Sequence, residues 1–269
     1  MNPIAPSLFF LAWAALGCGS RTSGGEDDAG NATGDGPADG AADQELADVT
    51  PDEPPVLFSF FVTSLETMRE QSGSQDGFGG DLGGLSGADA ICQTAADNVG
   101  FGYKQWRAFL SVTDGGAGSP VHAISRVGEG PWYDRNGRLM AEDVLGLLNT
   151  RPDGDPQTVS DLPDEFGVPL STLGDSHDIL TGSNMQGELD DSSPISTCYD
   201  WTSAVGAGTQ GQVRCGHSWP SMSGQHWIRT HPVGGCAPGV NLVQSGPPMD
   251  TTVGSGGGFG GIYCFALVP

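Results

Sequence analysis

Two stretches decide the fold of this chain: Gly80–Asp97, with the sequence GDLGGLSGADAICQTAAD, and Gly260–Ala266, with the sequence GGIYCFA. Apolar residues recur at helical spacing from Ala88 through Cys92 to Val99, which predicts an alanine-rich helix that packs close to a sheet. The second stretch is an apolar run of strand formers at the end of the chain. Together they indicate one domain that extends from an early helix to a terminal strand.

Composition narrows the fold class and the partners. The chain has 269 residues, of which 44 are Gly and only 16% are charged, so a bundle of long helices is excluded. We expect an α+β domain of short, mostly antiparallel strands with one or two helices and long loops. The net charge is −23, and residues 142–200 hold thirteen acids and only one base. Such a chain repels nucleic acid, since DNA and RNA binding needs Lys and Arg.

The N-terminus has the pattern of a targeting segment. Residues 1–18 contain a short apolar run that is typical of a signal peptide, and they end in Ala15-Leu16-Gly17-Cys18. This end resembles the bacterial lipobox, which implies a lipid on Cys18. Residues 19–56 lack aromatic residues and predict a disordered acidic tether, and residues 57–269 form the head. We therefore expect a lipid anchor in the bacterial cell envelope, at the outer membrane or cell surface, or a secreted protein if the signal is of the ordinary cleaved type.

The elements expected in the head follow from local patterns. Ser86 is expected to start the helix, with Asp89 as its capping partner. Asn149–Pro194 has little periodicity and predicts a long loop. The expected strands are 56–64, 105–112, 179–182, 201–203, 227–230 and 262–268, and a second short helix is expected at 141–148.

Five cysteines follow Cys18: Cys92, Cys198, Cys215, Cys236 and Cys264. Export permits disulfides, and the lack of any CxxC pair excludes zinc-finger and thioredoxin patterns. From the sequence alone, five cysteines allow fifteen ways to make two bridges and leave one thiol.

Several motifs along the head carry a resemblance to a known family. They are Gly80-Asp81-Leu82-Gly83-Gly84-Leu85, Ala88-Asp89, Cys92, Asp200-Trp201-Thr202-Ser203, Gly216-His217-Ser218-Trp219-Pro220 and Tyr263-Cys264-Phe265. This set resembles the DUF1554 family of bacterial surface lipoproteins, and more broadly the endostatin-like branch of the C-type lectin-like fold. The resemblance implies nested bridges from Cys92 to Cys264 and from Cys198 to Cys236, with Cys215 left unpaired.

Calcium is the cofactor that the acidic stretch suggests. The sugar-binding motifs of calcium-dependent lectins are absent, but Glu188, Asp190, Asp191 and Asp200 could supply the oxygen ligands that calcium prefers. The alternative is a solvated acidic loop without a metal.

Other residues suggest binding or catalysis. His217, His226 and His231 lie within fifteen residues, but their spacing favours structural histidines over a zinc site. Trp201, Trp219 and Trp227 are either core residues or part of a ligand-binding face.

These features favour a non-enzymatic, surface-tethered module for binding or adhesion to an extracellular protein or glycan. The alternative is an enzyme that uses a metal or Cys215.

Overall fold

The computed structural model describes residues 57–269 except residues 117, 210 and 244–250. The expected signal segment, the tether and the lipidation site Cys18 lie outside the described residues. The head mixes helices with short strands, which confirms the α+β class. Its resemblance to a C-type lectin-like fold stays a prediction.

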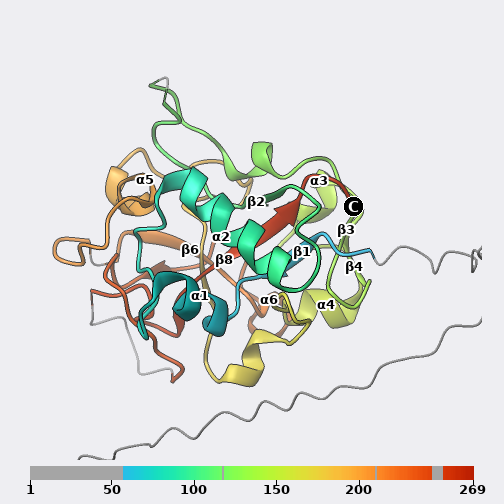
Figure 1. Ribbon diagram of the computed structural model, residues 1–269. Helices are drawn as coiled ribbons and strands as arrows, with labels where there is room; N and C mark the ends of the chain where they lie inside the picture. Colours follow the sequence, from blue (N-terminus) through green and yellow to red (C-terminus); the bar gives the residue numbers. More distant parts are fainter. Residues whose placement is uncertain (1–56, 117, 210, 244–250) are drawn as a thin grey trace, which may run out of the picture. The chain divides into compact units, whose positions relative to one another are not determined.

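Strand β8 (Gly258–Ala266) is the centre of the main sheet, and all nine of its residues are buried. Its C-terminal half lies between β1 (Phe60–Val62) and β2 (Trp106–Ala108), both antiparallel to it. Its N-terminal half runs parallel to β5 (Asp178–Leu180). Figure 1 shows β8 in the middle of the head with α2 across it. Burial on both faces explains why the sequence of β8 is a continuous apolar run rather than an alternating one.

The sheet continues beyond β5 with shorter strands. Strand β6 (Val213–His217) is antiparallel to β5, and β7 (Pro232–Val233) pairs with β6 at the edge. Strands β3 (Trp132–Tyr133) and β4 (Leu139–Ala141) form a separate two-stranded sheet.

Most of the helices are a single turn. The α-helices are α1 (Leu65–Ser72), α2 (Gly84–Asn98), α3 (Val144–Leu147), α4 (Pro156–Ser160), α5 (Cys198–Trp201) and α6 (Pro220–Ser223), and the 3-10 helices are η1 (Ala123–Arg126), η2 (Leu170–Leu173) and η3 (Pro194–Thr197). None of the helices in the described part of the chain is long and apolar enough to cross a membrane.

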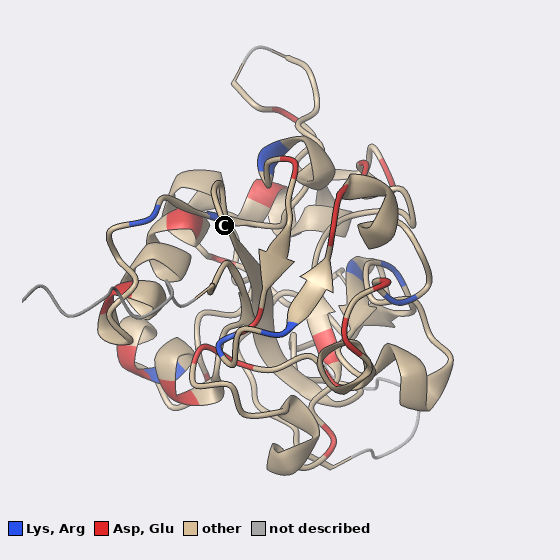
Figure 2. Cartoon of the chain, turned by 90° about the vertical axis from the view of Figure 1, so that its right-hand side faces the viewer, with Lys and Arg blue, Asp and Glu red and all other residues tan. Residues whose placement is uncertain are grey.

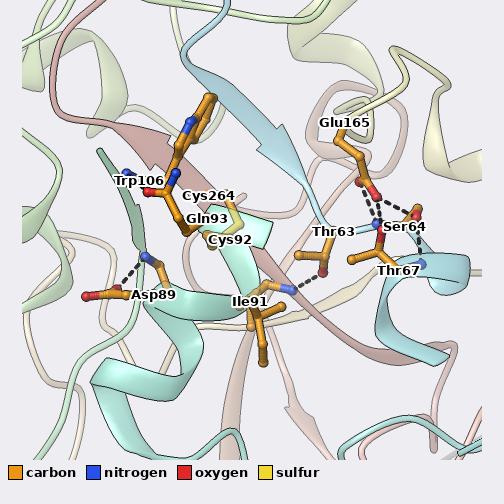
Figure 3. Close-up of a disulfide and its surroundings, with 12 residues drawn as sticks. Thr63, Ser64, Thr67, Asp89, Ile91, Cys92, Gln93, Trp106, Glu165 and Cys264 are labelled. Atoms are coloured by element: carbon orange, nitrogen blue, oxygen red, sulfur yellow. Dashed lines mark hydrogen bonds between the residues drawn. A yellow bond between two sulfur atoms is a disulfide. The ribbon is translucent and has the colours of Figure 1, made fainter. Parts of the chain in front are cut away.

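Helix α2 begins earlier than the sequence predicted. It starts at Gly84 after a left-handed glycine N-cap, so the expected start at Ser86 with Asp89 as capping partner is wrong. The Asp89 carboxylate instead accepts a hydrogen bond from the backbone N–H of Ala108 on β2 (Figure 3) and pairs with Arg126 at 2.8 Å. Asp89 therefore joins the helix to the sheet.

Two disulfides close the head. Cys92 on α2 is bonded to Cys264 on β8 (Figure 3), and Cys198 is bonded to Cys236, which confirms the pairing that the family resemblance implied. Among the described cysteines only Cys215 is unpaired. The bridges span 172 and 38 residues, for which the chain-entropy model gives roughly 5 and 4 kcal/mol. Such bonds fit an oxidising compartment outside the cytoplasm.

Helix α1 has no counterpart in the elements expected from the sequence. Two residues mark the ends of this helix. The hydroxyl of Ser64 accepts a hydrogen bond from the backbone N–H of Thr67 at the N-terminus, and Gly73 is a left-handed C-cap. The buried carboxylate of Glu165 accepts hydrogen bonds from the backbone and hydroxyl of Ser64 and from the hydroxyl of Thr67 (Figure 3). Burial raises the pKa of Glu165, and these donors oppose the shift.

The segment Cys198–Trp201 is a left-handed turn. Four consecutive residues other than glycine have φ between 48° and 63°, a conformation that costs roughly 1–2 kcal/mol per residue. The strand expected at 201–203 is therefore wrong, and residues 227–230 form no strand either. The turn persists because the Asp200 carboxylate accepts from the backbone and hydroxyl of Thr113, while the Trp201 indole donates to the carbonyl of Ser111.

The buried carboxyl group of Asp164, which precedes Glu165 in the sequence, makes the stability of the head depend on pH. Burial is the main cause that raises the pKa of Asp164 from 3.8 to about 6, and repulsion from Glu165 adds to it. The folded state then binds more protons than the unfolded state between these two pH values, so this group makes the head less stable as the pH rises through that window.

Asp164→Asn should remove this effect. Asparagine keeps an oxygen for the backbone N–H groups of Phe166 and Val168 and carries no charge. Urea denaturation should show the variant more stable than the wild type at pH 7, by at most about 3 kcal/mol, with little difference at pH 4. The exposed Glu70→Gln is the control. A variant that is less stable at both pH values would contradict the prediction.

Candidate functional site

The strands bring histidine and aspartate side chains together at one end of the β5–β6 pair. Asp178 is the first residue of β5, and its partners across the sheet are His217 at the end of β6 and Gly258 at the start of β8. His177 directly precedes β5, and His231 directly precedes β7. The side chains of His177, Asp178 and His231 meet, and we refer to them as the histidine–aspartate cluster.

The polar atoms of the cluster converge on one point. Nε2 of His177 lies 3.6 Å from Oδ1 of Asp178, and Nε2 of His231 lies 3.4 Å from the same oxygen. The three candidate ligand atoms all lie within 4.8 Å of one another, the one such group of three or more among the described residues. Both distances exceed the 2.7–3.2 Å of an ordinary N–H···O hydrogen bond. Normal hydrogen bonds therefore do not account for the arrangement.

The outer nitrogen of each imidazole faces an acceptor. Nδ1 of His177 lies 2.5 Å from Oδ1 of Asp175, and Nδ1 of His231 lies 3.4 Å from the carbonyl oxygen of Pro232. The carboxylate of Asp175 accepts a hydrogen bond, so Nδ1 of His177 carries its proton and Nε2 of His177 presents a lone pair. This lone pair and a carboxylate oxygen of Asp178 thus face one another, with Nε2 of His231 beside them.

The carboxylate at the centre is buried without sufficient donors. Burial is the main cause that raises the pKa of Asp178 well above its usual range. Its Oδ1 accepts from the thiol of Cys215 at 3.2 Å, and its Oδ2 is buried with no hydrogen-bond partner. Leaving such a group unpaired is costly, which marks Asp178 as a candidate functional residue.

Glycine backbone packs directly against the cluster. A Cβ atom on Gly256 would lie 2.9 Å from Oδ2 of Asp178, and one on Gly257 would lie 2.7 Å from Cε1 of His177. Both glycines have positive φ, +115° and +130°. The glycine run before β8 is therefore needed for this close approach.

A pocket of about 520 Å³ opens beside the cluster. It is lined by Asp175, His177, His217, Trp219, Met222 and Ser223. The His217 ring stacks on the His177 ring with centroids 4.4 Å apart, and Trp219 packs edge-on against both rings.

The pocket wall presents an N–H group at His217. Nδ1 of His217 accepts from the backbone N–H of Trp219 at 3.0 Å, so its proton is on Nε2. Burial, with repulsion from His177 and His231, lowers the pKa of His217 to about 3, which keeps the ring neutral at physiological pH. The indole Nε1 of Trp219 is buried with no hydrogen-bond partner.

Of the three tryptophans proposed as ligand-binding residues, only Trp219 lines the pocket. Trp201 and Trp227 are fully buried, so their assignment to a binding face is wrong. The indole of Trp227 donates to the carbonyl of Leu147, and its ring packs against Tyr263. Both residues are core because each large ring also finds a partner for its N–H.

The four acids predicted to bind calcium do not form one ligand group. Asp190 pairs with Arg214 at 2.5 Å and lies 3.7 Å from Arg229, while Asp191 is exposed. Asp200 holds the left-handed turn as described above, and the side chain of Glu188 is exposed. In Figure 2 the acidic residues are spread over loops and helix ends around the head. Calcium binding stays a prediction from the sequence.

His177, Asp178 and Asp175 were not predicted from the sequence. Their stretch was expected to be a long loop, in which Glu188, Asp190 and Asp191 were the acids proposed as metal ligands. The available signals were the order Asp-Ser-His-Asp directly before a short apolar strand, and the glycine run before β8. His231 was considered only together with His217 and His226, and His226 lies outside the cluster.

No known protein-family model matches this chain, and a search of curated proteins finds no match. The resemblance to DUF1554 therefore stays a prediction.

The environment of Cys215 predicts an inert thiol. The residue is fully buried, and burial raises its pKa well above the usual range, with the nearby Asp178 adding to the shift. A nucleophilic cysteine needs the opposite environment. A small thiol reagent at pH 8 should leave Cys215 unmodified in the native protein and modify it in denaturant, as read by peptide mass mapping. Rapid modification of the native protein would refute this.

Proposed function

We propose that the head is a non-enzymatic binding module that takes an extracellular ligand, a glycan, in the pocket beside the histidine–aspartate cluster. The observation that carries the proposal is the convergence of His177, which precedes β5, with His217 and Trp219, which lie at and just after the end of β6, on one pocket. Its volume of about 520 Å³ falls in the range of small-ligand sites, which combine apolar walls with a few placed polar groups.

The chemistry of the walls supports a ligand rich in oxygen. The pocket offers the N–H group of His217, which pairs with acceptor oxygens. The indole ring and Met222 add apolar surface. A sugar combines hydroxyl oxygens with an apolar C–H face, so it matches both features. The alternative ligand is a protein side chain with carboxylate or amide oxygens.

An enzyme that uses Cys215 is not supported by this geometry, because the thiol is buried and hydrogen-bonded inside the sheet. Adhesion through the pocket needs no nucleophile, and it accounts for the aromatic rings in the walls.

Trp219→Phe should weaken binding. The change replaces the indole by a smaller ring and removes apolar surface from the pocket wall, so a loss of about 1 kcal/mol is expected, roughly fivefold in affinity. A glycan array with the full chain would identify a glycan, and titration with that glycan would give the affinity of each variant. Tyr199→Phe, an exposed aromatic residue outside the pocket, is the matched control. Equal affinities of Trp219→Phe and wild type would overturn the proposal, and so would an array on which no glycan binds.

We also propose that a lipid on Cys18 tethers the head to the bacterial envelope. The support is the lipobox-like end of the apolar run and a pair of disulfides that fits an extracytoplasmic location. Mass spectrometry of the mature N-terminus should show an acylated Cys18, and Cys18→Ala should move the protein from the membrane fraction to the soluble fraction. A mature chain that starts elsewhere and carries no lipid would rule the tether out.

A further inference from the structure

We propose that His177, Asp178 and His231 bind one divalent transition-metal ion of the zinc class, through the two imidazole Nε2 atoms and the carboxylate. This inference goes beyond the proposed glycan binding and does not require it. It rests on ligand geometry, on an excess of acceptor atoms, and on the groups that hold the ligands in place.

The spacing of the ligand atoms fits a tetrahedral ion. Zinc binds imidazole nitrogen and carboxylate oxygen at about 2.0–2.1 Å, so two ligand atoms of one tetrahedron lie roughly 3.3–3.4 Å apart. Oδ1 of Asp178 lies 3.6 Å from Nε2 of His177 and 3.4 Å from Nε2 of His231. These distances are too long for good hydrogen bonds and close to the edge of a zinc tetrahedron.

The cluster holds more acceptors than donors. Nε2 of His177 presents a lone pair, because its Nδ1 donates to Asp175. The Asp178 carboxylate adds two oxygens, of which Oδ2 is buried without a partner. Among the described residues, the donor that is hydrogen-bonded to Asp178 is the Cys215 thiol, which also lies 2.8 Å from the carbonyl of His231 and has a single proton for the two contacts. A bound cation would satisfy all of these acceptors at once.

The surroundings resemble the outer shell of a metal site. Asp175 at Nδ1 of His177 supplies the carboxylate–histidine contact that fixes the tautomer and orientation of metal-ligating histidines. The glycine backbone at Gly256 and Gly257 confines Asp178 and His177. The His231 side chain is 42% exposed, whereas those of His177 and Asp178 are buried. A metal ion can therefore enter past His231.

The ligand types select the metal. Two imidazoles and one carboxylate suit zinc and related transition metals, whereas calcium and magnesium prefer an all-oxygen shell. Three protein ligands leave a fourth position for water or for an oxygen of a bound molecule. The site is thus separate in place and in chemistry from the acids around Asp190 that the sequence suggested for calcium.

The test is zinc binding by the full chain after treatment with chelator. Equilibrium dialysis with metal analysis should give one zinc per chain, and cobalt as a probe should give the strong visible absorption of tetrahedral coordination. His231→Ala, at a half-exposed position that folding should tolerate, should weaken binding by at least about tenfold and abolish the cobalt spectrum. Asp175→Asn should weaken zinc binding by about 10–100-fold while it keeps one zinc per chain. His122→Ala, which removes an imidazole outside the cluster, is the matched control.

Zinc should also raise the melting temperature of the wild type and not that of His231→Ala, since an ion that binds the folded state stabilises it by mass action. Absence of zinc binding, or equal binding by His231→Ala and wild type, would overturn the proposal. Glycan titration in the presence of chelator separates the two proposals, because glycan binding without any zinc site would leave the proposed function intact.

Discussion

The position of β5 between β6 and β8 is the constraint on which the site depends. Asp178 opens β5, and its two neighbours across the sheet are the last residue of β6 and the first residue of β8. The parallel contact with β8 is fixed because β8 is buried along its whole length and is bonded to α2 through Cys264. The site is thus assembled at the first residue of β5 and at the residues that directly precede β5 and β7, and the pairing of these strands limits how far its side chains can move apart.

The head buries acidic groups although its sequence is strongly acidic. Asp164, Glu165 and Asp178 are all shielded from solvent, and burial raises the pKa of each. The first two have donors: backbone N–H groups surround Asp164, and Ser64 and Thr67 surround Glu165. At Asp178 the described residues supply the Cys215 thiol to Oδ1 and no hydrogen-bond partner to Oδ2. That contrast separates two buried acids that the fold satisfies from one that it leaves partly unsatisfied.

Local pattern predicted the helix that carries Cys92 and the main strand, and the family resemblance implied the disulfide pairing, but neither could predict the site. The helix that carries Cys92 and the apolar run that carries Cys264 were evident because burial leaves a periodic or continuous apolar pattern. The predicted start of α2 was wrong because the helix begins after a glycine with left-handed backbone angles, whereas a polar side chain was expected to cap it. His177 and His231 are far apart in the sequence, and they meet only through the order and register of β5, β6 and β7. That order depends on long-range pairing, about which a local pattern carries no information.

The left-handed turn at Cys198–Trp201 limits where residues can be inserted into or deleted from the chain. In one turn the chain must present a disulfide to Cys236, a carboxylate to Thr113 and an indole to Ser111, while Tyr199 projects into solvent. Its side chains wind in the opposite sense to those of an ordinary helix, so an inserted or deleted residue would turn every later side chain away from its anchor. Insertions and deletions should therefore be excluded from these four residues and tolerated in the exposed loops on either side. The turn therefore fixes the spacing of the side chains that contact Cys236, Thr113 and Ser111.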